Sequence, residues 1–300
     1  MYYIIYVPLY LLSLLPFAVL YFLSDYFYAL TYYVIRYRRK LVLNNLAIAF
    51  PEKTAAERKK IAKQFYKNFV DTFIETIKMM SITDKEFEKR STIDIEPINK
   101  IAGTVTKIHF HSGHQMNWEY GSGILAKRLQ VPLVGVYMPV ENKALDKIFY
   151  NLRSKYNLVL ISAEQFRTRM HNVFKTHYGL GLIADQKPAS GDAGYWLNFF
   201  SKPAAFVRGP DKMARRNNPA IVFVKFTRIK RGYFHYDTIL ITVNGNELNE
   251  GDLTNKYRDF LEESIRLQPD NYLWSHHRWK YDYNPGYKNR WIDHKSAAPE

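Results

Sequence analysis

The sequence predicts an α/β domain with a mixed sheet flanked by helices, preceded by an N-terminal transmembrane helix. Two observations predict it: an uncharged apolar stretch comes first, and short β-rich runs alternate with helical segments from Thr104 onward. Such alternation is typical of a sheet with helices packed against it. Because 47% of the 300 residues are hydrophobic, the chain can bury a core, which excludes a disordered protein or a collagen.

The first 24 residues carry no charged side chain. As a helix they would extend about 36 Å, enough to cross a hydrocarbon core of about 30 Å. Ten of the 24 tyrosines lie between Tyr2 and Tyr37, and basic residues follow at 36 and 38–40, as expected of a cytoplasmic membrane flank. A buried core helix and a cleaved signal peptide are the alternatives. We expect residues 1–35 to be a retained single-pass anchor, with the rest of the chain in the cytoplasm.

Helices follow this anchor. Capping boxes of the Ser/Thr-x-x-Glu type occur at 54–57 and 83–86, and apolar side chains keep one helical face from 61 to 80. A further amphipathic helix is expected from 253 to about 267.

Strands are indicated by β-rich runs bounded by turn residues. The turn at 230–232 predicts that the two longest runs form a hairpin. We expect one domain over 36–285 and a loose tail over 286–300. The expected strands are 104–111, 131–138, 158–161, 180–184, 220–229 and 233–243.

Three histidines, His109, His111 and His114, stand close together. Their spacing resembles the H-x-H-x-D-H zinc site of the metallo-β-lactamase fold, which would make the chain a metal-dependent hydrolase. Gly113, however, occupies the aspartate position of that pattern. His109 and His111 share one strand face, so the competing hypothesis is that both are satisfied sheet residues lining a polar cleft.

A second hypothesis pairs His114 with Glu119. Five steps along a helix leave two side chains roughly 140° apart, so the two can meet only if His114 precedes the helix, which Gly113 permits. A neutral imidazole oriented by the carboxylate could then take a proton from a substrate hydroxyl. The H-x4-E spacing alone is weak evidence, and a capping histidine with a solvated glutamate is the alternative.

Six ordered segments resemble the bacterial lipid A biosynthesis acyltransferases, the lauroyl/myristoyl or "late" acyltransferases of the glycerolipid acyltransferase superfamily. The resemblance runs from the anchor to about Lys280. Its segments are 38–52, the H-x4-E segment at 113–119, 136–153, 185–200, 208–215 and the closing Leu-Trp-x-His-x-Arg signature at 272–280.

The resemblance implies a glycerolipid acyltransferase-like fold and transfer of a fatty acyl chain from an acyl-carrier-protein thioester to a hydroxyl of a lipid A precursor at the bacterial inner membrane. His114 would be the general base and Glu119 would orient it. No cofactor or metal is implied, and direct transfer is consistent with the absence of cysteine. Residues implied to bind substrate or the oxyanion are Arg153, Asp185, Gln186, Arg208 and Arg278, beside backbone N–H groups of the helix after His114.

Departures from the family pattern at Met138, Asn157 and His277 leave the acceptor open. An ornithine lipid, an aryl polyene or another glycolipid stays possible, as does acyl-CoA as donor. A non-catalytic, membrane-bound binding protein is the remaining alternative class.

The net charge of +15 indicates an anionic partner. The segment 202–231 contains nine basic residues and one acidic residue, Asp211. This cluster could hold anionic lipid, acceptor phosphates or the acidic carrier protein, or it could be a solvated surface. Nucleic acid is a poor candidate because no recognised binding motif accompanies the charge.

Overall fold

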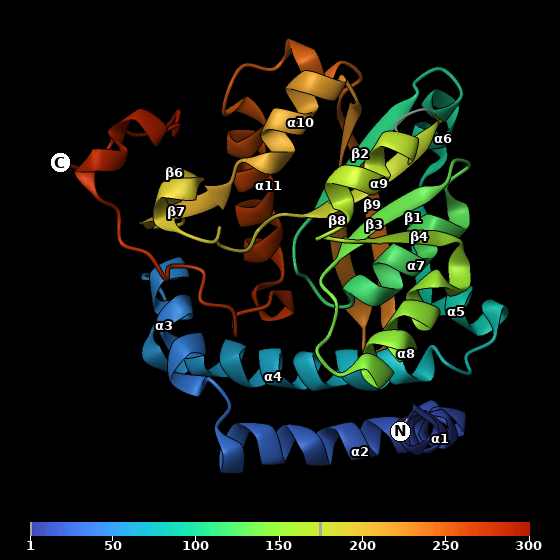
Figure 1. Ribbon diagram of the computed structural model, residues 1–300. Coiled ribbons are helices and arrows are strands. Elements are labelled where there is room, and N and C mark those ends of the chain that lie inside the picture. Colours follow the sequence, from blue (N-terminus) through green and yellow to red (C-terminus); the bar gives the residue numbers. More distant parts are fainter. Residues whose placement is uncertain (1, 174–175) are drawn as a thin grey trace.

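The central sheet of the computed structural model, which describes residues 2–173 and 176–300, runs β1-β9-β8-β2-β5-β3-β4 (Figure 1). All neighbouring strands in it are parallel except β8 and β9, which form the expected antiparallel hairpin. The predicted mixed α/β fold is therefore confirmed, and β1 is a strand that we did not expect. The strands are β1 (Ser91–Asp94), β2 (Lys107–Ser112), β3 (Leu133–Tyr137), β4 (Leu158–Ser162), β5 (Tyr178–Ile183), β8 (Ala220–Lys230) and β9 (Tyr233–Thr242).

Helices cover both faces of this sheet. Alternate side chains of β8 point to opposite faces. Ile221 and Phe223 join the core cluster that contains residues of α4 and α11, whereas Val222 and Val224 join the cluster that contains residues of α5 and α7. The helices of the domain are α3 (Arg39–Ala49), α4 (Ala55–Lys78), α5 (Asp84–Arg90), α6 (Glu96–Ala102), α7 (Trp118–Arg128), α8 (Lys143–Arg153), α9 (Phe166–Val173), α10 (Gly209–Asn217) and α11 (Asp252–Leu267).

Both expected capping patterns form at helix starts. The Thr54 hydroxyl accepts a hydrogen bond from the Glu57 N–H, and the Glu57 carboxylate accepts one from the Thr54 N–H, which starts α4. Thr83 caps α5 through the N–H of Glu86. These bonds satisfy N–H groups that the first helical turn leaves free.

The N-terminal apolar segment is two helices rather than one. α1 (Tyr2–Leu14) ends before Pro16, and α2 (Phe17–Ala29) continues into the π-helical segment η1 (Leu30–Ile35). Proline disfavours a helical conformation in the preceding residue and lacks an N–H group, so the chain bends there. Among the described residues, the helix that is long and apolar enough to cross a membrane is thus Phe17–Ile35, later in the chain than expected.

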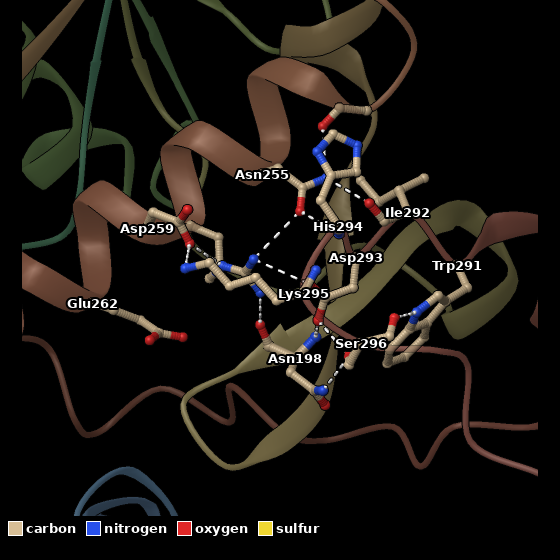
Figure 2. A network of polar contacts seen from close by, with 12 residues as sticks. Asn198, Asn255, Asp259, Glu262, Trp291, Ile292, Asp293, His294, Lys295 and Ser296 are labelled. Atoms are coloured by element: carbon tan, nitrogen blue, oxygen red, sulfur yellow. Dashed lines mark hydrogen bonds and ion pairs between the residues drawn. The ribbon is translucent and has the colours of Figure 1, made fainter.

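The chain end packs against the domain (Figure 2). Asp293 forms an ion pair of 3.2 Å with the buried Arg258 of α11 and accepts a hydrogen bond from the N–H of Asn198, in β6 (Gly194–Phe199). The indole N–H of Trp291 donates to the carbonyl of Ser296. The expectation of a loose tail over 286–300 is therefore wrong for these residues, because polar side chains that suggested a solvated tail are bonded to β6 and α11.

Candidate active site

Two loops at the carboxyl ends of neighbouring strands form the candidate site. β2 and β5 are parallel partners, with Ser112 opposite Ile183. Residues that follow the two strands therefore lie at one edge of the sheet, where open α/β sheets bind ligands. The loop after β2 carries His114, and the segment after β5 carries Asp185 and Gln186.

His114 is bonded to Asp185. Its Nδ1 lies 2.5 Å from Asp185 Oδ1, and its backbone N–H donates to Oδ2 of the same carboxylate at 3.0 Å. The Nε2 atom lies 3.2 Å from the Gln186 amide nitrogen. Since Asp185 accepts at Nδ1, Nε2 is the unprotonated nitrogen of the neutral ring, and the Gln186 amide donates to it.

The two partners differ in exposure. The Asp185 side chain is 1% exposed and that of His114 is 21% exposed. Burial alone would raise the pKa of Asp185, but electrostatic attraction to His114 and the two hydrogen bonds from that residue outweigh burial and hold the pKa below its usual value. A buried carboxylate thus orients an imidazole that is partly exposed.

Glu119 is not the Nδ1 partner of His114, contrary to the sequence-based expectation. As expected, His114 precedes α7, and Glu119 lies in its first turn. The Glu119 carboxylate instead binds Arg153 at the end of α8, with Nε 2.9 Å from Oε2 and Nη2 2.5 Å from Oε1. Sequence spacing suggested a partner for His114 within the same segment, whereas the fold supplies one from the neighbouring strand.

Trp118 contacts both His114 and Glu119. Its indole N–H donates to Glu119 Oε1 at 3.2 Å, and its ring meets the His114 ring edge-on, with centroids 5.9 Å apart. The structure therefore groups His114, Trp118, Glu119, Arg153 and Asp185 around one loop.

The start of α7 is tied to α4. The Asn117 side chain accepts hydrogen bonds from the N–H groups of Glu119 and Tyr120 and donates to Glu75 Oε2 at 3.0 Å. Tyr21 of α2 donates to the other carboxylate oxygen of Glu75, also at 3.0 Å. Because these helix N–H groups already have a partner, they do not serve as the free oxyanion donors that the sequence suggested.

Burial, followed by the nearby Asp71, raises the pKa of Glu75 from 4.5 to about 7. Between these values the folded chain holds a proton that the unfolded chain has lost, so stability should fall as the pH rises, by about 3 kcal/mol in all. Glu75→Gln keeps the side-chain shape and should remove this slope. Urea unfolding at several pH values between 4.5 and 7.5 measures the free energy of unfolding of both proteins. If this free energy depended on pH in the same way in both, the raised pKa of Glu75 would be contradicted.

The C-terminal signature segment braces the histidine loop. Gln115 and Tyr272 form an antiparallel bridge, and the Leu273 N–H donates to the His114 carbonyl at 3.0 Å. The Tyr272 phenol also lowers the pKa of Asp185. Asn45 in turn donates to the carbonyls of Trp274 and His276, each at 2.8 Å. Segments far apart in sequence thus converge on one loop.

Arg278 is buried close to this loop. Its Nη1 donates to the Ala205 carbonyl at 2.8 Å, and its guanidinium lies 4.0 Å above the Phe206 ring. Burial lowers the pKa of Arg278, whereas the charge of Asp185 acts in the opposite direction. Within the described residues, its Nε and Nη2 atoms have no hydrogen-bond partner.

Arg208 is placed elsewhere. It precedes α10, lies over the Tyr195 ring and pairs with Glu250 at 3.6 Å. No contact described for it reaches His114. Six of the nine basic residues between 202 and 231 have acidic partners, which makes this segment less available to an anionic ligand than its net charge suggests. The six are Lys202, Arg208, Arg215, Lys225, Arg228 and Arg231.

His109 and His111 are core residues of β2. Both are buried, and burial lowers the pKa of His111 to about 3, so both rings are neutral. In the described part of the chain, His109 has no hydrogen bond at either nitrogen, so the expectation that both are satisfied is wrong. The zinc hypothesis also fails, because His109, His111 and His114 do not bring ligand nitrogens together into a metal-binding group among the described residues.

Sequence reasoning missed the structural roles of several site residues. Trp118 and Tyr272 lay inside segments that carried the resemblance, so their position was a usable signal. Asn45 also lay inside such a segment, whereas Glu75 left no such signal, because its role depends on contacts made across the fold. His276, whose Nε2 accepts a hydrogen bond from the Lys187 N–H, was also unassigned; burial and the charge of Arg278 lower its pKa to about 4.

The comparisons with known proteins agree with one another. A family model described as bacterial lipid A biosynthesis acyltransferase matches residues 1–281. The lipid A biosynthesis palmitoleoyltransferase of Escherichia coli K12 is 22% identical over 275 residues, covering 89% of this chain and 86% of that protein. The lipid A biosynthesis lauroyltransferase of the same organism is 23% identical over 274 residues, covering 91% and 89%.

Proposed function

Because the chain belongs to the bacterial lipid A biosynthesis acyltransferase family, and is therefore an acyltransferase, we propose that it moves a fatty acyl chain from an acyl-carrier-protein thioester to a hydroxyl of a lipid A precursor. The reaction takes place at the cytoplasmic face of the bacterial inner membrane. The observation that carries the proposal is the His114–Asp185 pair, in which Asp185 holds Nδ1 and leaves Nε2 as the acceptor nitrogen of a side chain that is partly exposed.

His114 is the general base in this proposal. Nε2 takes the proton of the acceptor hydroxyl while Asp185 keeps the proton at Nδ1 and stabilises the imidazolium that forms. Gln186, which donates to Nε2 in the structure, gives way to the incoming hydroxyl. The oxygen attacks the thioester carbonyl, the C–S bond breaks, and the imidazolium returns the proton to the leaving sulfur.

Arg153 is the proposed oxyanion donor. Two of its nitrogens bind Glu119, and a guanidinium carries five N–H donors, so donors remain for a tetrahedral intermediate. Glu119 would then act through Arg153, by fixing where the guanidinium lies. Arg278 contributes a buried positive charge near Asp185, and Arg208, which is paired with Glu250, would contact a distal part of the substrate.

The test is a transfer assay with detergent-solubilised protein. Candidate acceptors are a lipid A precursor, an ornithine lipid and an aryl polyene, each offered with acyl-carrier-protein or acyl-CoA donors, and mass spectrometry detects the acylated product. We expect a mass gain of one acyl chain on the lipid A precursor with the carrier-protein donor. Gain on another lipid alone would reject the acceptor, and gain on none would reject the reaction.

A further inference from the structure

The outer surface of the N-terminal helices is apolar and exposed. Ile4 is 75% exposed, Phe22 is 74% exposed and Val34 is 70% exposed. Patches of this kind on a soluble domain mark an interaction site. Other exposed apolar side chains of α1, α2 and η1 are Tyr3, Val7, Tyr10, Leu11, Leu14, Val19, Tyr26, Phe27, Tyr33 and Ile35.

The opposite face of α2 is bonded to the domain by polar groups. Ser24 donates to Asp71 at 2.6 Å, Tyr21 donates to Glu75 at 3.0 Å, and Asp25 pairs with Arg231 at 2.9 Å. Asp71 and Glu75 belong to α4 and are buried. Removing α2 would leave these carboxylates with fewer partners, which is costly for buried charges.

The bonded arrangement fixes the direction of α2. Figure 1 shows α2 running along α4 on one side of the domain, with α1 at the end of α2 where that helix begins. α4 carries charged residues along its length and so cannot enter hydrocarbon. A helix that lies along α4 and keeps these bonds therefore stays at the depth of α4 and does not cross a bilayer. α1, with 13 residues, would extend only about 20 Å as a helix, which is too short to cross.

Basic side chains border the apolar face. The ammonium groups of Lys63 and Lys67 lie over the rings of Tyr33 and Tyr28, and Arg39 lies over Tyr32. Arg36 and Lys40 are exposed just after η1. An apolar face bordered by tyrosine and cationic groups fits the interface of an anionic bilayer, where apolar groups enter the acyl region and cations meet the headgroups.

We propose that α1, α2 and η1 lie flat in one anionic phospholipid leaflet, so that the chain is monotopic rather than single-pass. The inference rests on the membrane location in the proposed function and specifies how the membrane is bound. Asn117 links the site loop to α4 through Glu75, so this orientation holds His114 on the part of the domain next to the leaflet, where a lipid acceptor presents its headgroup.

Depth measurement tests the orientation. The chain has no cysteine, so single spin labels can be placed at Val19→Cys, Tyr26→Cys and Val34→Cys without other changes. Ala297→Cys, which is exposed at the chain end, is the matched water-accessible control. The full-length protein is reconstituted in phosphatidylglycerol–phosphatidylethanolamine vesicles, and collision with oxygen and with a nickel chelate reports depth.

We expect the three helix labels to share one shallow depth and the control to remain in water. A crossing helix would instead spread Val19 and Val34 over about 22 Å of depth, and that result would overturn the in-plane orientation while leaving acyl transfer and membrane binding intact. Labels that all stay in water would reject both the orientation and the membrane location. The transfer assay on the same preparations shows separately whether the reaction itself holds.

Discussion

Replacing His114 with alanine is expected to lower the rate of acyl transfer by about 10²- to 10⁴-fold, because a positioned general base contributes roughly this factor. No other described group has an acceptor nitrogen bonded to Asp185, so the acceptor hydroxyl would keep its proton. The rate constant is measured with saturating donor and acceptor, and the product is followed by mass spectrometry.

The matched control is His177→Ala. His177 is exposed and precedes β5 at the end of the strand opposite Asp185, so its removal should leave the rate unchanged. Thermal unfolding of both variants separates a lost base from a lost fold. A His114→Ala protein that is folded and still transfers at the original rate would reject the histidine as the base.

Asp185→Asn should reduce kcat by an amount on the order of 10³-fold, with KM little changed, because an amide in this position can donate to Nδ1 and stabilise the wrong tautomer of His114. The variant should also change acid stability. The folded pKa of Asp185 is depressed, so its ionised form stabilises the fold above the unfolded pKa, and this contribution is lost as the pH falls through the folded pKa. Asparagine should remove that part of the pH dependence.

The variant Glu119→Gln distinguishes the role of the Glu119 carboxylate from that of the Asp185 carboxylate. A glutamine oxygen can still accept from Arg153 and Trp118, so we expect a smaller loss of kcat than in Asp185→Asn. The reverse order, a severe loss in Glu119→Gln and a mild one in Asp185→Asn, would restore Glu119 as the group that orients His114.

The sequence predicted the central elements well because their signals are local. Apolar runs bounded by turn residues indicated β2, β3, β4, β5 and the β8–β9 hairpin, and capping boxes indicated α4 and α5. The hairpin of β6 with β7 (Lys202–Val207) was missed. Pro203 argues against a strand, and the turn uses Phe200 at a φ of 55°, where glycine or asparagine would have signalled it.

The candidate site was only partly predictable, because it depends on contacts between segments that are far apart in the sequence. The H-x4-E spacing identified His114 as a candidate, and the family resemblance implied Asp185 and Arg153, but neither showed which of these residues meet. The pairing of His114 with Asp185 depends on β5 lying beside β2, although β3 and β4 come between them in the chain. Strand order is decided by packing of the whole sheet, and spacing within one segment carries no information about it.

The bridge between Gln115 and Tyr272 has a consequence for the time course of synthesis. A ribosome must add 157 residues after Gln115 before its partner exists, and closing so long a loop is a slow, entropically opposed step. The loop that holds His114 therefore reaches its final shape only after the segment around Tyr272 has been made. Nascent fragments that contain the histidine and its aspartate but not Tyr272 should consequently be inactive.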